Sequence, residues 1–201
     1  MKILKSITNR KDIIGDVERE KRINITLAYL IIVLITSLPL LTDFLLCGTK
    51  LSHQLIRIEA LKNGLQQYGL HLWAKPEWIH PTGLSFAFYY GDTFLYIPAV
   101  LNLLGFSVQA SYSLFLILIN IVTVLVAYKV FEKIFIDKYA GILGTALYSA
   151  SIYRMFLLYG EAEVGEVLSL IFLPVVLYGC YLLFCDENTK WSYFWIAIGL
   201  S

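Results

Sequence analysis

Charged residues are scarce in this chain, and three long stretches contain none. Asp, Glu, Lys and Arg make up 15% of the 201 residues, whereas a soluble globular domain has roughly 25%. The uncharged, apolar stretches are residues 25–41, 110–128 and 167–184. Each approaches the ~20 residues that a helix needs to cross the hydrocarbon core of a bilayer. The composition therefore excludes an ordinary soluble domain and predicts a protein whose first partner is the lipid bilayer.

Motifs for several common activities are also absent. The sequence has no Walker loop, GxGxxG, GxSxG or zinc motif, so nothing supports a nucleotide-binding ATPase. The formal net charge of +1 gives no reason to expect a nucleic-acid partner. The three cysteines and three histidines lack metal-binding or redox spacing. We interpret the cysteines as packing residues and the histidines as loop residues.

Basic residues indicate how the chain is oriented. Seven of them precede the first apolar stretch: Lys2, Lys5, Arg10, Lys11, Arg19, Lys21 and Arg22. Because Lys and Arg next to a span are retained in the cytoplasm, the N-terminus is predicted to be cytoplasmic. The apolar stretch is longer than the ~7–15 residues of a signal peptide and lacks a small-residue cleavage site, which favours an uncleaved signal anchor.

We predict an all-α, multipass transmembrane helical bundle with a long external first loop. Its segments are a cytoplasmic N-terminus (1–22), a first span (23–46), the external loop with amphipathic and interfacial helices (47–110), spans at 111–131, 139–159 and 167–184, and the start of a fifth (191–201). The last segment gives only about 16 Å of helix. We therefore expect the N-terminal portion of a larger protein.

Apolar periodicity adds detail to two of these segments. Five apolar residues recur at helical spacing early in the external loop, which predicts a helix lying in the membrane interface; they are Leu51, Leu55, Ile58, Leu61 and Leu65. In the third predicted span, Gly141, Thr145 and Ser149 fall at four-residue intervals. Such a small-residue face is typical of closely packed membrane helices.

Ionisable residues near the predicted outer face are the candidates for chemistry. Asp92 precedes an apolar helix within Gly-Asp-Thr, so it is either an N-cap or a site carboxylate, and the two roles are compatible. Glu166 opens a span, where the helix dipole alone would explain an acid. Alternatively, Glu161, Glu163 and Glu166 bind a divalent cation (Mg or Mn) together with Asp92, because hard cations prefer several carboxylate oxygens.

Several segments taken together resemble one family of large bacterial multipass membrane proteins. They are GTKLSHQLIRIEALKNGL (48–65), YGDTFLYIPA (90–99), LGFS (104–107), YR (153–154) and VGE (164–166). The family is described as 6-pyruvoyl-tetrahydropterin synthase-related, or YfhO-like, and is similar to GT-C type glycosyltransferases. The resemblance implies an enzyme of the bacterial plasma membrane that transfers a sugar from a polyprenyl-phosphate donor during cell-envelope polysaccharide or polymer assembly.

The resemblance also implies roles for particular residues. An acid at the outer face would act as a base or metal ligand, and a planar Arg fork would bind the lipid phosphate. The catalytic candidates are Asp92, Glu166, Asp43 and Glu59. The candidates for lipid-phosphate or substrate binding are Arg57 and Arg154.

Three positions depart from the family pattern. Lys50 stands where the family has Asp, Gln54 where it has His, and Glu161 where relatives have Arg. Either Asp43 replaces the lost acid or this copy is inactive. A non-enzymatic membrane protein, such as a transporter or flippase fragment or an envelope-assembly subunit, is the alternative. The absence of an inverted repeat favours the enzyme over a transporter.

Overall fold

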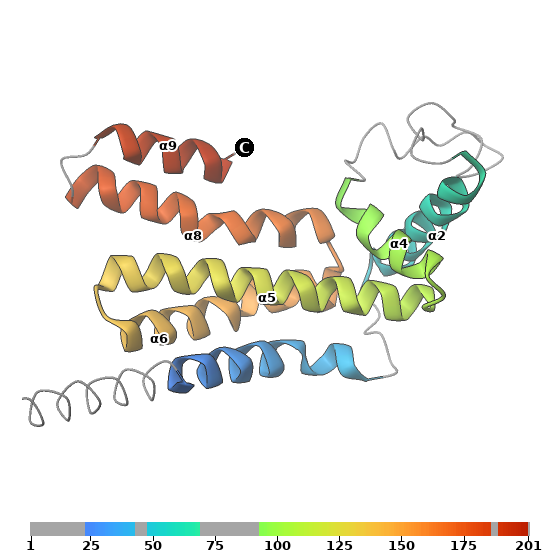
Figure 1. Ribbon diagram of the computed structural model, residues 1–201, viewed down its shortest axis with the longest axis horizontal. Helices are drawn as coiled ribbons and strands as arrows, with labels where there is room; N and C mark the ends of the chain where they lie inside the picture. The colour runs from blue at the N-terminus through green and yellow to red at the C-terminus, as the bar shows by residue number, and fades with distance from the viewer. Residues whose placement is uncertain (1–22, 43–47, 69–92, 186–188, 201) are drawn as a thin grey trace, which may run out of the picture. The chain divides into compact units, whose positions relative to one another are not determined.

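The computed structural model describes residues 23–42, 48–68, 93–185 and 189–200. Within these ranges the chain forms helices and turns and no β-strand, which agrees with the predicted all-α class. The elements are a first helix (Ile23–Leu41) that ends in the 3-10 turn η1 (Leu38–Leu41), α2 (Leu51–Tyr68), η4 (Thr93–Leu95), α4 (Tyr96–Leu103), α5 (Val108–Phe135), α6 (Lys138–Ser149), α7 (Ile152–Met155), the π-helical η5 (Phe156–Glu161), α8 (Val164–Cys185) and α9 (Thr189–Leu200) (Figure 1).

Three helices are long and apolar enough to cross a membrane: Ile23–Leu41, Val108–Phe135 and Val164–Cys185. A fourth span results if Lys138–Ser149 and Ile152–Glu161, which meet at an angle of 45°, are counted as one broken helix. The prediction of a helical chain with several candidate membrane spans is confirmed to this extent. The cytoplasmic N-terminus and the external position of the first loop stay predictions from the charge pattern.

The candidate spans carry large apolar side chains on their surfaces. Leu30 and Ile35 of the first helix are each 60% exposed, and Leu147 of α6 is 68% exposed. A soluble monomer rarely presents contiguous apolar surface of this kind to water. Hydrocarbon is a suitable covering for such faces, so the exposure pattern agrees with helices that lie in a bilayer.

Contacts divide the chain into two compact units. The first comprises Met1–Thr36, Thr123–Ser149 and Phe172–Ser201. The second comprises Ser37–Val122 and Ala150–Ile171. The long helices α5 and α8 therefore contribute residues to both units, and each unit is described by itself below.

Small residues allow close helix packing in the first unit. A Cβ atom added to Gly141 of α6 would lie 3.0 Å from the Glu132 Cα on α5, and Thr145 and Ser149 are both fully buried. The predicted small-residue face is thus confirmed as a packing face. The α8–α9 hairpin is equally close (Figure 1), because a Cβ on Gly199 would lie 2.4 Å from a side-chain carbon of Val176.

The second unit contains the short helices that follow the first span. Helix α2 packs against α4 (Figure 1), and Ile58 of α2 and Ala99 of α4 are completely buried. The predicted apolar stripe of α2 therefore faces protein. Gln54, which the sequence placed off that stripe, is nevertheless buried at 4% exposure.

An unusual backbone path completes the second unit. Helix α7 continues into η5, a π-helix over Phe156–Glu161, and π-helical turns are frequent at functional sites. Ala162 then adopts a left-handed conformation with φ of +56° before α8 begins. This turn brings residues 161–163 beside the segment that leads into α2.

Candidate functional site

Two backbone hydrogen bonds join the start of α2 to the end of η5. The Thr49 amide donates to the Gly160 carbonyl at 3.2 Å, and the Lys50 amide donates to the Glu161 carbonyl at 3.1 Å. These bonds connect segments that are more than a hundred residues apart in the sequence. They fix the register in which the two segments present their side chains.

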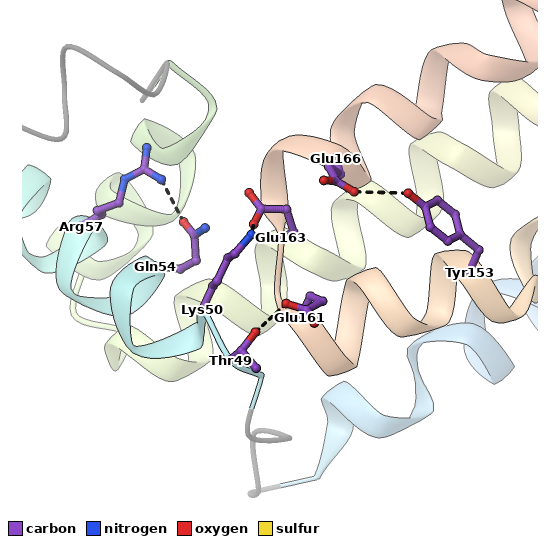
Figure 2. Close-up of polar contacts among 8 residues, drawn as sticks. All are labelled: Thr49, Lys50, Gln54, Arg57, Tyr153, Glu161, Glu163 and Glu166. Atoms are coloured by element: carbon purple, nitrogen blue, oxygen red, sulfur yellow. Dashed lines mark hydrogen bonds and ion pairs between the residues drawn. The ribbon is translucent and has the colours of Figure 1, made fainter.

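Side chains of the same segments pair across this junction. The Lys50 ammonium forms an ion pair with the Glu163 carboxylate, and the Thr49 hydroxyl donates a hydrogen bond of 2.6 Å to Glu161 (Figure 2). We call these four residues the junction cluster. The Glu163 side chain is 11% exposed, whereas that of Lys50 is 49% exposed. Glu163 therefore depends on its partner more strongly than Lys50 does, because water still reaches the ammonium group.

The local sequence explains why the segments approach so closely. A Cβ atom on Gly48 would lie only 2.7 Å from the Cβ of Ala162, so a larger residue at position 48 would collide with the turn. Ala162 itself occupies the left-handed region, which costs a non-glycine residue roughly 1–2 kcal/mol. The Glu163 amide donates to the Leu157 carbonyl at 3.1 Å and closes the turn. The small residue at position 48 and the strained backbone of Ala162 therefore both help to hold the junction cluster together.

Glu166 lies in the first turn of α8, as predicted. Its carboxylate is exposed and accepts a hydrogen bond of 3.3 Å from the Tyr153 hydroxyl (Figure 2). An acid at a helix N-terminus is favoured by the helix dipole. Glu166 is therefore placed beside the junction cluster with a partner of its own.

The α2 candidates occupy a different position. The Arg57 guanidinium donates to the Gln54 side-chain oxygen at 3.2 Å (Figure 2). Glu59 is exposed on the same helix. The other two catalytic candidates, Asp43 and Asp92, lie outside the described residues.

Arg154 is buried inside the second unit, with 1% of its surface exposed. Its guanidinium donates to the Asn120 side-chain oxygen at 2.5 Å, and the Asn120 amide nitrogen donates to the Ser37 hydroxyl at 2.9 Å. Tyr159 also interacts electrostatically with Asn120 and Arg154. Asn120 lies twelve residues after Val108, or about 18 Å along α5. The structure therefore buries Arg154 against α5, and its position at the outer face of the membrane stays a prediction.

The parts of the chain that the structure describes contain no group of three or more His, Cys, Asp or Glu side chains arranged to hold a metal ion. Glu161 and Glu163 are instead directed toward Thr49 and Lys50. The divalent cation (Mg or Mn), which was expected to involve Asp92 as well, stays a prediction.

Glu163 is the site residue that the sequence pattern did not single out. The pattern grouped it with three other acids, Glu161, Glu166 and Asp92, whereas the structure shows a largely buried carboxylate paired with the Lys50 ammonium. The one local signal is the Glu-Ala-Glu spacing of residues 161–163, in which a single small residue separates two acids. The role of Lys50 as the partner has no local signal, because 113 positions separate the pair.

Comparison with known proteins found no relative of this chain. No protein-family model, curated protein or solved structure matches the chain. The family resemblance is therefore supported only by the segments quoted above.

Proposed function

We propose that this chain is a polyprenyl-phosphate-sugar-dependent glycosyltransferase of cell-envelope polysaccharide or polymer assembly, located in the bacterial plasma membrane with its N-terminus in the cytoplasm. The observation that carries the proposal is the largely buried Glu163 carboxylate paired with Lys50. It lies immediately before α8, a candidate span, where a lipid-linked donor would present its phosphate. A carboxylate and a cation side by side are what sugar transfer from a lipid phosphate requires.

The pair suggests a division of labour. The phosphate of the donor would take the place of Glu163 at the Lys50 ammonium, which frees the carboxylate. The acceptor hydroxyl oxygen then bonds to the sugar C1 while the bond from C1 to the phosphate oxygen breaks. Glu163 receives the hydroxyl proton, and the departing lipid phosphate keeps the electron pair and is stabilised by Lys50. Glu166 is the second base candidate because it lies one helical turn further along.

The departures from the family pattern fit this proposal. Lys50 and Glu161 each reverse the charge that the resemblance leads us to expect, and a backbone hydrogen bond of 3.1 Å joins the two residues, whose side chains bind Glu163 and Thr49 respectively. Paired reversals of opposite sign preserve the charge balance of a cluster, whereas random decay would not be expected to. They therefore support a rearranged site over an inactive remnant.

One observation favours the non-enzymatic alternative. Glu161, Glu163 and Glu166 each accept a hydrogen bond from a neighbouring side chain. A cluster whose acids are already satisfied also suits a structural fastening between helices, as in a transporter or flippase fragment or an assembly subunit. In that case the acids would matter for stability and not for any reaction.

A membrane-based sugar-transfer assay separates the two functions. Membranes that contain the full chain would be supplied with labelled polyprenyl-phosphate sugars, with and without Mg²⁺, Mn²⁺ or a chelator. Glu163→Gln should lower transfer by about 10²–10⁴-fold, which is the usual effect of losing a general base. Glu166→Gln, Asp92→Asn and Lys50→Asp would test the other candidates.

Glu132→Gln, on α5, is the matched control because it removes an acid from the first unit. Normal transfer by Glu163→Gln at normal protein levels would exclude Glu163 as the base. No transfer by the native chain with any donor, together with a stability loss in Glu163→Gln, would favour the structural role.

A further inference from the structure

Helix α4 exposes large apolar side chains and buries its asparagine. Every exposed side chain of this helix is apolar; they are Ile97, Val100 and Leu103. Its buried residues include Ala99 and the polar Asn102, and α2 packs against it. A helix with one face in water shows the reverse pattern, with apolar residues inside and polar residues outside. The outward face of α4 is therefore suited to hydrocarbon.

Helix α2, the packing partner of α4, has an outward face of the ordinary kind. Its buried residues include Ile58 and Leu61. Most of its exposed side chains are polar, with Ile56 as the exception among those that the structure describes; they are Ser52, His53, Glu59, Asn63 and Gln66. The two helices thus form a pair with one polar and one apolar outer surface.

The apolar surface of α4 continues onto a candidate membrane span. Leu104 and Phe106, in the turn after α4, are exposed, and so is Leu118 of α5. The turn is short and closed: the Asn102 side-chain amide donates to the Phe106 carbonyl at 2.8 Å, and Gly105 adopts a φ of +105°, which glycine tolerates. Helix α4 is therefore held next to the start of α5.

The charge pattern of α5 indicates the depth at which that start lies in a bilayer. Residues 108–128 carry no charge and rise about 31 Å as a helix, which matches the ~30 Å hydrocarbon core. The charged residues Lys129, Glu132 and Lys133 follow at the other end. Val108 therefore belongs at the boundary between hydrocarbon and headgroups. Helix α4, which is about 12 Å long, is too short to cross the core itself.

We propose that α4 lies in this boundary region with Ile97, Val100 and Leu104 among the acyl chains of one leaflet, while α2 covers its other side against water. A helix of this kind buries its apolar face about 5–10 Å into the boundary. The sequence predicted an interfacial helix from the apolar stripe of α2, but that stripe faces protein, so the contact with lipid passes to α4.

Lipid fits this face better than a protein partner does. Residues 93–107 contain no charged residue, whereas a protein interface has a polar rim and several hydrogen bonds. The contact also has a consequence for the junction cluster, because Thr49 and Lys50 directly precede α2. A lipid-anchored α4 would hold that cluster at the membrane surface. This consequence is the same for an enzyme and for a structural protein, so the proposal does not depend on the proposed function.

Spin labels on single cysteines test the proposal, because oxygen concentrates in hydrocarbon and a water-soluble nickel chelate does not enter it. The full chain, with its three cysteines replaced by alanine, is reconstituted in phosphatidylcholine vesicles. Ile97→Cys, Val100→Cys and Leu104→Cys each carry the label. Ile56→Cys on α2 is the matched control, since Ile56 is 50% and Ile97 40% exposed. The ratio of oxygen to nickel collision rates should be about fivefold higher at the α4 positions than at the control.

Each outcome decides the proposal. Leu118→Cys on α5 is the reference for a lipid-facing position, and the α4 labels should resemble it. A nickel collision rate at the α4 positions as high as at Ile56→Cys would place this face in water and overturn the proposal. Low collision rates with both reagents would mean that protein covers the face, which would also overturn it.

A pair of charge substitutions provides an independent measurement. Val100→Asp should raise the nickel collision rate of a label at Leu104→Cys about fivefold, because a carboxylate is costly among acyl chains and would draw α4 toward water. Ile56→Asp, on the polar face of α2, should leave that rate unchanged. Equal rates in the two variants would overturn the proposal. No sugar donor is present in these experiments, so their outcomes are independent of the transfer assay.

Discussion

The ion pair between Lys50 and Glu163 predicts an asymmetric response to mutation. Lys50→Met would remove the positive charge beside a carboxylate whose side chain is 11% exposed, whereas Glu163→Gln would remove the negative charge beside an ammonium group whose side chain is 49% exposed. Isolated charges that stay buried cost far more than charges that water can reach. We therefore expect Lys50→Met to be the more damaging of the two changes, although both remove the same ion pair.

The exposures set the magnitudes. Lys50→Met should lower the free energy of unfolding by about 2–3 kcal/mol, within the range for a mostly buried group that loses its partner. Glu163→Gln should cost about 1 kcal/mol, close to the value for an exposed pair. The double variant should be less unstable than the sum of the single variants, with a coupling energy of about 1–2 kcal/mol.

Reversible unfolding in mixed detergent micelles, with increasing fractions of a denaturing detergent, would provide the four free energies. Lys62→Met on α2 is the control and should change stability by no more than about 0.5 kcal/mol. A larger loss in Glu163→Gln than in Lys50→Met would refute the reasoning from exposure. A coupling energy near zero would show that the ion pair does not contribute to folding.

Three other predictions test the packing, the buried polar group and the topology. Gly199→Leu should separate α8 from α9 and cost at least about 1–3 kcal/mol in detergent unfolding, because even a Cβ would lie 2.4 Å from a neighbouring side chain. Gly165→Ala, which meets nothing within 4 Å, should be neutral or stabilising by up to about 1 kcal/mol and is its control. Asn120→Leu removes an acceptor of the buried guanidinium, so it should cost about 2–4 kcal/mol in the same assay. Reporters fused after Thr82 and after Asp137 should be outside and inside the cell, respectively, and either opposite result would reverse the topology.

Much of the helical framework could be predicted from the sequence because it follows from local patterns. Charge-free runs of span length indicated the candidate membrane spans, and the Gly141 face indicated close packing, since each depends on neighbouring residues. The bend of 45° between α6 and α7 was not predicted. The break falls at Ala150 and Ser151, the second of which is the N-cap of α7, and neither is the proline or glycine that usually signals a break.

The candidate site was predictable only in composition. The acids near residue 161 were recognised as site candidates. Their partners, Thr49 and Lys50, lie more than a hundred positions earlier, and no local sequence pattern links the two segments. The left-handed turn at position 162 could not be predicted either. Glycine is the usual sequence signal of a left-handed backbone, and this position holds alanine. Arg154 was predicted to bind the lipid phosphate or substrate, and its burial against Asn120 could not be predicted, because it depends on how two helices pack.

The π-helical segment has a consequence for how the length of this chain can change over generations. A π-helix accommodates one residue more than an α-helix over the same turn, so deleting one residue of Phe156–Glu161 would leave an ordinary helix with no break. Because the wider turn absorbs the extra residue, the deletion would leave Arg154 and Glu161 in nearly the same relative orientation. The buried guanidinium and the junction cluster could then both keep their partners. This segment should therefore tolerate the loss of one residue better than the regular helices on either side of it.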